Sequence, residues 1–311
     1  MTQPQTEKKT SVIVPAFNEA DNMPDLFSEL ASALRDADLD AEVVLVDDGS
    51  TDGTLEAARR AAAAAGLTDA RFLSHRSNRG KTDALLTGAE ASSGEYLVLF
   101  DADLQHSPEE IERFVRALDE GSDLVTGRKV GRYEKRFVSG VYNWLSRLIF
   151  RVPVHDLNSM KAFRRSVIEE MELRDDWHRY LVVLAHDRGF RLREIDVELH
   201  PRRHGATKYG GRQRILIGTL DLLAVWFQLV FGRKPLLFFG ITGIALLGLG
   251  AITGAIAIYL RFVLGQGYRP LLTLVLLLVL VGLGLFVLGF LAELIAGLRA
   301  EVEALRRDMR K

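Results

Sequence analysis

The sequence contains no cysteine, and its positive and negative charges nearly cancel. With 0 Cys, disulfide bonds and thiolate metal sites are excluded, which fits a reducing compartment. The formal net charge of −1 conceals an uneven distribution. Residues 1–234 mix charged and apolar residues as a water-soluble domain does, whereas two later stretches have almost no charge.

The two stretches that lack charge are residues 235–260 and 271–292. Each exceeds the roughly 20 residues that cross a bilayer core. A pair of buried core helices would be an alternative, but both runs are apolar on all faces and flank the short loop RFVLGQGYR. We therefore predict a two-helix transmembrane anchor over residues 235–292. Because no apolar segment lies near the N-terminus, we expect no signal peptide.

Basic residues flank the predicted anchor on one side of the membrane. The loop between the spans has only Arg261 and Arg269, so the positive-inside rule places the large domain and both termini in the cytoplasm. The basic stretch before the first span could bind nucleic acid, but its position beside a membrane favours anionic lipid headgroups. We therefore expect a membrane partner and no nucleic acid. The basic residues are Arg202, Arg203, Lys208, Arg212, Arg214, Arg233 and Lys234 before the spans, and Arg299, Arg306, Arg307 and Arg310 after them.

Short apolar runs alternate with helical patterns in the first 130 residues. This alternation predicts an α/β fold with a mostly parallel, doubly wound sheet. Ser50 or Thr51 is the expected cap of the second helix, and Ser107 followed by Pro108 predicts the start of another. The expected strands are residues 11–17, 42–46, 71–74, 95–100, 123–126 and 190–199, and the expected helices include residues 18–37, 133–150, 175–187 and 212–231.

The chain divides into five predicted segments. The tail has apolar residues at Leu294, Leu298, Val302 and Leu305, a spacing that suits either a coiled-coil seam or a lipid-facing helix. The segments are a disordered N-terminus at 1–9, a catalytic domain at 10–210, juxtamembrane interface helices at 211–234, the anchor at 235–292 and a cytoplasmic amphipathic tail at 293–311.

Paired carboxylates follow two of the predicted strands. Val43 to Val46 leads into Asp47 and Asp48, and the strand ending at Phe100 leads into Asp101 and Asp103. Acids just past the carboxyl ends of parallel strands lie where open α/β sheets bind ligands. Together with phosphate oxygens they can also hold a hard divalent cation. These features predict a metal-assisted enzyme acting on a nucleotide.

Three of these acids have a structural alternative. Asp48 could equally be a turn-forming residue before Gly49. Asp101 and Asp103 could belong to a helix-capping loop, but Ser107 already fills that role.

The first half of the chain carries the motifs SVIVPAFNE, VVLVDDGSTDGT, NRGKTDALLTG and FDADLQHSPE. Together they resemble the family 2 glycosyltransferases with the GT-A-type, Rossmann-like fold. The second half carries HDLNSMKAFRR, HRYLVVLA and PRRHGATKYG, followed by the two terminal spans. These features resemble the polyprenyl-phosphate glycosyltransferases, such as the dolichyl-phosphate mannosyltransferases and undecaprenyl-phosphate glucosyltransferases. The chain departs from the common pattern at Thr82-Asp83 and in the segment from Lys161 to Arg164. Neither change removes a charged group from the chemistry that the family implies.

The resemblance implies roles for individual residues in donor binding. Asp47 corresponds to the acid that recognises the nucleoside, and Asp48 to a neighbour that supports its loop. Asp101, Asp103 and Gln105 correspond to the groups around Mg²⁺ or Mn²⁺. The remaining nucleotide-binding residues would be Pro15, Phe17, Asn18 and Glu19 at the base and ribose, and Gly80 and Lys81 at the diphosphate.

The resemblance also implies an acceptor-phosphate site and a catalytic acid. Asp156 resembles the family's central acid, which could orient the acceptor or a basic residue. We interpret His155, His178 and His204 as local structure, and Arg132, Arg203 and Arg212 as surface or headgroup charges. The acceptor-phosphate residues would be Arg128, Lys135, Arg136, Ser139, Arg202, Thr207 and Lys208.

The resemblance therefore implies an inverting, metal-dependent transfer of one hexose from a UDP- or GDP-sugar to polyprenyl phosphate at the cytoplasmic membrane face. A processive polysaccharide synthase is one alternative, although neither its additional spans nor a QxxRW-type motif is found. A non-catalytic membrane scaffold is another, which the intact Asp47, Asp101, Asp103 and Gln105 disfavour. This interpretation also allows a homo-oligomer.

Overall fold

The computed structural model describes residues 9–130, 150, 152–157, 159–171, 177–204, 225–227, 231 and 234–309. It divides into two compact units, Met1–Gly211 and Arg212–Lys311, which are considered one at a time. Residues 1–8 of the predicted disordered segment at 1–9, and most of the predicted helices at 133–150 and 212–231, lie outside the described residues.

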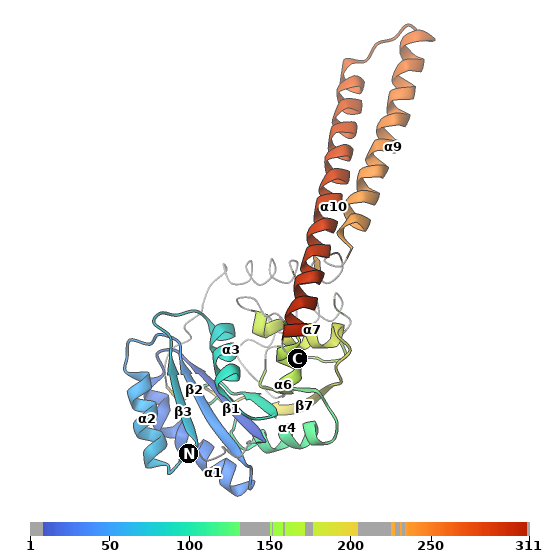
Figure 1. The fold of residues 1–311 in the computed structure, drawn as a ribbon. Coiled ribbons are helices and arrows are strands. Elements are labelled where there is room, and N and C mark those ends of the chain that lie inside the picture. The colour runs from blue at the N-terminus through green and yellow to red at the C-terminus, as the bar shows by residue number, and fades with distance from the viewer. Residues whose placement is uncertain are drawn as a thin grey trace. The chain divides into compact units, whose positions relative to one another are not determined.

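The first unit is built on a seven-stranded sheet in the order β3-β2-β1-β4-β6-β5-β7. Figure 1 labels β1, β2, β3 and β7 of this sheet. The prediction of a mostly parallel sheet is confirmed, with β6 running antiparallel to both β4 and β5. That reversed strand lies between the two halves of the sheet. The strands are Thr10–Ala16 (β1), Ala41–Asp47 (β2), Ala70–Ser74 (β3), Tyr96–Leu99 (β4), Leu124–Val130 (β5), Lys161–Arg164 (β6) and Leu192–Glu198 (β7).

Helices cover both faces of this sheet. In the large core cluster, α1, α2 and α4 pack on one face, where β1 and β2 contribute Val12, Val14, Val43 and Leu45. Helix α3 packs on the other face, where Ala84 meets Val44 and Val46. The helical elements are η1 (Ala20–Asn22), α1 (Met23–Asp36), α2 (Thr54–Ala64), α3 (Lys81–Ala91), α4 (Glu110–Asp119), α6 (Arg165–Glu169), η2 (Trp177–Tyr180) and α7 (Leu181–Asp187).

The helix predicted over residues 18–37 is confirmed as η1 and α1, but the expected cap of α2 was wrong. The helix begins at Thr54, and the Asp52 carboxylate accepts a hydrogen bond from the Thr54 backbone N–H at 3.0 Å. Ser50 Oγ instead accepts from the backbone N–H of Asn18 at 2.8 Å. The hydroxyl therefore joins two loops at the sheet edge, which leaves it unavailable to the helix.

The parallel register aligns the carboxyl ends of three strands. Ala16 lies opposite Asp47, and Ile13 lies opposite Leu99. The loops that follow β1, β2 and β4 therefore emerge at one edge, which is where an open α/β sheet binds its ligand.

The second unit contains the helical hairpin of α9 (Pro235–Phe262) and α10 (Arg269–Met309). Both helices are long and apolar enough to cross a membrane, with candidate spans at Pro235–Phe262 and Arg269–Leu298. Glycines bring the helix backbones together, since a Cβ on Gly243 would lie 2.6 Å from the Gly282 carbonyl oxygen. Glu293 Oε2 accepts a hydrogen bond at 3.1 Å from the backbone N–H of Leu236, in the first turn of α9.

Candidate active site

Asp47 and the β1 loop form one side of the candidate site. The Asp47 carboxylate is buried and accepts from the Ser50 backbone N–H at 3.1 Å and from Ser74 Oγ at 3.2 Å. Asn18 adopts a left-handed backbone with a φ of 52°, and the Glu19 backbone N–H donates to Thr54 Oγ1 at 2.9 Å. The loop after β1 and the loop after β2 are thus joined by side chains of the DGSTDGT motif. Pro15 pairs in register with Val46 at the end of β1, and Phe17 follows directly after the strand.

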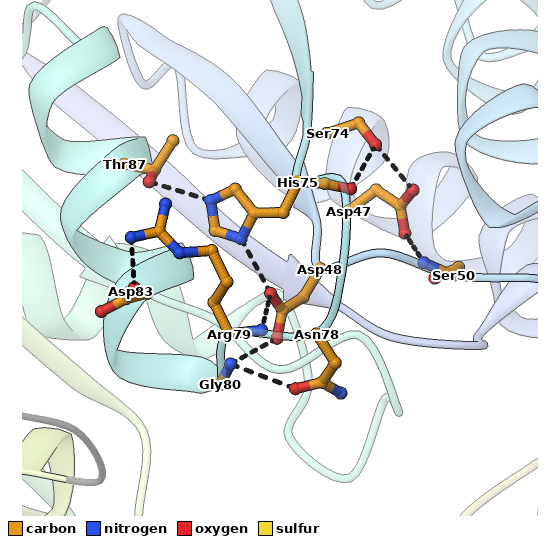
Figure 2. Close-up of polar contacts among 10 residues, drawn as sticks. All are labelled: Asp47, Asp48, Ser50, Ser74, His75, Asn78, Arg79, Gly80, Asp83 and Thr87. Carbon is orange, nitrogen blue, oxygen red and sulfur yellow. Dashed lines mark hydrogen bonds and ion pairs between the residues drawn. The ribbon is translucent and has the colours of Figure 1, made fainter.

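Asp48 holds a neighbouring loop in place. Its buried carboxylate accepts from the backbone N–H groups of Arg79 at 2.9 Å and Gly80 at 2.8 Å, and lies 2.8 Å from His75 Nδ1 (Figure 2). The sequence left open whether Asp48 supports a loop or forms its own turn before Gly49. These contacts favour the first alternative, support of the loop at residues 78–80.

Two glycines make this arrangement sterically feasible. Gly49 has a φ of +75°, and a Cβ there would lie 2.5 Å from the backbone carbon of Ser77. Gly80 has a φ of +91° immediately before α3 begins. Both positions need backbone that L-residues with side chains rarely adopt.

Lys81, the first residue of α3, forms an ion pair with Asp101 in the loop after β4. Burial opposes ionisation of Asp101, but the adjoining Lys81 ammonium outweighs it and holds the pKa of this carboxyl well below its usual range. The NRGK motif and the DAD motif therefore meet at the sheet edge.

Asp103 pairs with Arg202, whose Nη2 lies 2.8 Å from Asp103 Oδ2. Burial and the neighbouring charge of Asp101 raise the pKa of Asp103, and Arg202 partly opposes this effect. The His200 backbone N–H also donates to the carbonyl oxygen of Gln105 at 2.8 Å. Arg202 of the PRRHG motif and His200, just before it, therefore lie against the loop that carries the two acids.

The donor set of this loop fits a hard divalent cation. The carboxylates of Asp101 and Asp103 and the amide oxygen of Gln105 are oxygen ligands, which suit Mg²⁺ or Mn²⁺, and phosphate oxygens and water complete such sites. Among the described residues, no three His, Cys, Asp or Glu side chains gather into a metal-binding group. A cation here would therefore depend on a bound phosphate group for part of its coordination.

Asp156 lies in a second, buried group of charges. Its side chain is 6% exposed, and its Oδ2 lies 3.6 Å from Lys129 Nζ. Its backbone N–H donates to Glu194 Oε1 at 3.0 Å. Lys161 on β6 is buried and donates to the Ser159 carbonyl oxygen at 2.9 Å. Burial, reinforced by the charge of Lys81, lowers the pKa of Lys161 to about 7.

The sequence motifs did not assign a role to Lys129 or Lys161. A lysine in an apolar strand was the available signal for Lys161, since it stands between the buried Met160 and Ala162. Nothing in the local pattern around Lys129 indicates a partner 27 positions further along the chain.

Of the remaining predicted acceptor residues, the structure describes only Arg128. Arg128 makes a bidentate contact with Asp196, at 2.6 and 2.8 Å, and both side chains are exposed. Arg203 pairs with Glu29 and Asp25 of α1, in keeping with its predicted surface role. Lys135, Arg136, Ser139, Thr207 and Lys208 lie outside the described residues.

Two buried histidines lie near the paired acids. His178 Nδ1 is 3.0 Å from Thr82 Oγ1, and the same hydroxyl oxygen accepts from the His178 backbone N–H at 3.2 Å. Burial and the charge of Lys81 hold the pKa of His178 well below its usual value. Burial also lowers the pKa of His106 to about 4, and its Nδ1 has no partner within the described part of the chain.

Comparison with known proteins decides the family. The model of glycosyl transferase family 2 matches residues 11–171, and this region includes the acids of both strand ends. The chain belongs to glycosyl transferase family 2. It is therefore a glycosyltransferase, as its motifs predicted.

Curated relatives cover nearly the whole of this family 2 chain. It is 35% identical over 306 residues to the dodecaprenyl-phosphate galacturonate synthase of Rhizobium johnstonii, covering 94% of the chain and 89% of the relative. It is 31% identical over 306 residues to the undecaprenyl-phosphate 4-deoxy-4-formamido-L-arabinose transferase of Aeromonas hydrophila, covering 96% of the chain and 91% of the relative. Both relatives carry a polyprenyl phosphate in their names.

Solved structures support the GT-A fold. Glucosyl-3-phosphoglycerate synthase from Mycobacterium tuberculosis, in complex with Mn²⁺, UDP and glucosyl-3-phosphoglycerate, is similar with a TM-score of 0.55 and 21% identity over 71% of this chain and 80% of that chain. The same enzyme in complex with Mg²⁺ and UDP has a TM-score of 0.55 and 22% identity, covering 69% and 79% of the two chains.

Proposed function

We propose that this glycosyltransferase moves one hexose-type sugar from a UDP- or GDP-linked donor to polyprenyl phosphate, with inversion at the anomeric carbon. The acceptor class is supported by relatives that carry polyprenyl phosphate in their names and align along nearly the whole chain. The donor class is supported by the fold shared with a synthase crystallised with UDP.

One observation carries this proposal: two carboxylates at the sheet edge are each paired with a cation from another part of the chain. Lys81 pairs with Asp101, and Arg202 pairs with Asp103. Such a group of alternating charges suits a substrate that arrives as a metal-bound diphosphate. Asp101, Asp103 and the Gln105 amide oxygen would hold Mg²⁺ or Mn²⁺, which supplies positive charge to the departing diphosphate.

The residues on the N-terminal side of the sheet would bind the rest of the donor. Asp47 and the loop from Phe17 to Glu19 are proposed to contact the nucleoside. Gly80 and Lys81 are proposed to contact the diphosphate, because α3 begins there and a helix N-terminus favours anions.

The acceptor requires cations rather than a strong base. A phosphate monoester has a second pKa of about 6, so at neutral pH it is largely a dianion and needs no proton removed. One of its oxygens forms the new bond to the anomeric carbon as the bond from that carbon to the donor diphosphate breaks. Arg202 pairs with Asp103 and is proposed to hold the acceptor in line. Asp156 is proposed to orient Lys129 within the acceptor site. The rest of this site is proposed to be formed by Arg128, Lys135, Arg136, Ser139, Thr207 and Lys208.

The membrane helices fit a lipid acceptor. We propose that α9 and α10 form a two-span anchor with the catalytic unit and both termini in the cytoplasm. The short loop between the spans has few basic residues, which supports this orientation.

A transfer assay with purified full-length protein tests the proposal. Radiolabelled UDP- and GDP-sugars, including neutral hexoses and uronic acids, are offered with polyprenyl phosphate and with Mg²⁺ or Mn²⁺. We expect a lipid-linked monosaccharide from one donor class. Formation of a long polymer would favour the processive synthase, and a protein that binds no nucleotide and transfers no sugar would favour the scaffold.

A further inference from the structure

His75 connects the end of β2 to helix α3 through its two ring nitrogens (Figure 2). Nδ1 lies 2.8 Å from Asp48 Oδ1, and Nε2 lies 3.0 Å from Thr87 Oγ1. The side chain is only 7% exposed. Because a carboxylate accepts hydrogen bonds and does not donate them, Nδ1 carries the proton in the contact with Asp48.

The contact with His75 orients a carboxylate that is shared by three donors. Asp48 Oδ1 also accepts from the Arg79 backbone N–H, and Oδ2 accepts from the Gly80 backbone N–H. Both oxygens are therefore engaged, and the plane of the carboxylate is fixed relative to the loop at residues 78–80. Without His75, two backbone N–H groups would have to hold Asp48 alone.

The 78–80 loop determines where α3 begins. Gly80 has a φ of 91° and a ψ of 161°, and the next residue, Lys81, starts the helix and pairs with Asp101. The following residue, Thr82, is buried and bonded to His178, so the first turn of α3 is held from a second side. The position of the Lys81 ammonium thus depends on contacts that lie behind the site.

We propose that His75 is a positioning residue for the donor's diphosphate, acting through Asp48 on the 78–80 loop and the first turn of α3. The inference rests on the proposed function, because it takes Gly80 and Lys81 as the diphosphate-binding segment. His75 itself does not touch the ligand. Its effect is preorganisation, since a loop that is already held loses less conformational freedom when the ligand binds.

This role predicts a loss of donor affinity with little change in the chemical step. In His75→Leu both ring contacts are lost, and Asp48 loses a charge-assisted hydrogen bond. We expect the dissociation constant for the nucleotide to rise roughly tenfold, the donor KM to rise in parallel and kcat to stay within about threefold of wild type. In His75→Asn the amide nitrogen can replace Nδ1, so we expect part of the affinity to return.

Calorimetric binding of UDP and of GDP, each with Mn²⁺, to the purified full-length protein provides the test. Tyr96→Phe is the matched control, since it removes the 2.9 Å hydrogen bond to Asp119 at the amino end of β4, away from the site. We expect the nucleotide affinity of this control to equal that of wild type. The inference is wrong if His75→Leu binds the nucleotide as wild type does, or if Tyr96→Phe weakens binding equally.

Hydrogen exchange of the free protein separates this inference from the proposed function. We expect the amides of Arg79 and Gly80 to exchange faster in His75→Leu and, to a smaller extent, in Thr87→Val. Unchanged exchange would overturn the inference even if nucleotide binds. If wild type binds neither nucleotide, the proposed donor site fails and the diphosphate role fails with it, whereas faster exchange would still show that His75 holds the loop.

Discussion

Arg202 Nη2 lies 2.8 Å from Asp103 Oδ2, so a residue of the predicted acceptor motif contacts a predicted metal ligand. The two side chains come from segments 99 positions apart in the chain. This contact places the proposed acceptor cation beside the proposed donor site, as an in-line transfer between two phosphate-bearing substrates requires.

The first prediction concerns Arg202 itself. Arg202→Ala should lower kcat/KM for the lipid acceptor roughly ten- to hundredfold, because it removes a charge-assisted contact. Arg202→Lys should recover only part of this, since the bidentate fork is lost. Arg203→Ala is the control, because this exposed arginine pairs with partly exposed acids on α1. A variant that lost nucleotide binding while keeping the acceptor KM would contradict the assignment.

Asp103→Ala should abolish transfer and leave the fold intact. The substitution removes one proposed metal ligand and leaves Arg202 without its partner. We expect Asp101→Asn to have a weaker effect on metal dependence, because an amide oxygen can still bind the cation. The measurement is transfer as a function of Mn²⁺ concentration, with circular dichroism as a check on folding. Activity near wild type at saturating Mn²⁺ would exclude a metal role for Asp103.

Glu42 provides a prediction about stability and pH. This buried carboxylate accepts hydrogen bonds from Ser11 Oγ at 2.8 Å and from Ser93 Oγ at 2.8 Å, and lies 3.2 Å from Arg71 Nε. Burial opposes its ionisation, but the backbone N–H of Ser93 and these other partners outweigh it, so the pKa of Glu42 is lowered.

A lowered pKa in the folded state stabilises the protein above the unfolded pKa of about 4.3, and this contribution is lost as the pH falls through the folded pKa. Glu42→Gln should therefore cost about 1.5–3 kcal/mol near neutral pH. Thermal unfolding should show a lower Tm for the variant at pH 7 and a difference that shrinks below about pH 4. Glu90→Gln, at an exposed position of α3, should show no such difference. A difference in Tm between wild type and Glu42→Gln that stayed constant with pH would argue against an ionised Glu42.

Gly243→Leu should disrupt the packing of α9 against α10. A Cβ at this position would lie 2.6 Å from the Gly282 carbonyl oxygen and 2.8 Å from the Phe286 backbone nitrogen. Overpacking of this kind costs typically about 1–3 kcal/mol. Gly248→Leu is the matched control on the same helix, because a Cβ there meets no atom within 4 Å. Thermal stability in detergent should fall for the first variant only.

The proposed topology predicts that tags at both termini are digested from the cytoplasmic side. In sealed vesicles of cytoplasmic-side-in orientation, both tags should be protected until the membrane is permeabilised. A C-terminal tag that is digested in intact vesicles would contradict the two-span arrangement.

Local patterns in the sequence were sufficient for six of the seven strands, the first helix, the acids at the strand ends and the two candidate spans, but β6 was not predicted. Apolar periodicity and uninterrupted apolar length act through neighbouring residues, so they can be interpreted without tertiary structure. The family motifs extended this to the GT-A fold, because several of them occur together in the order typical of the family. The cap of α2 was mispredicted because Ser50 is bonded to Asn18, a residue in another loop.

Only the tertiary structure decided which charged groups meet. Asp48 and His75 are 27 positions apart, and Lys81 and Asp101 are 20 apart. Neither spacing belongs to a helix or strand period. The antiparallel strand β6 likewise places Lys161 between β4 and β5, where burial lowers its pKa. A sequence reveals which residues can ionise or accept a hydrogen bond, but partners and burial depend on how the sheet brings distant segments together.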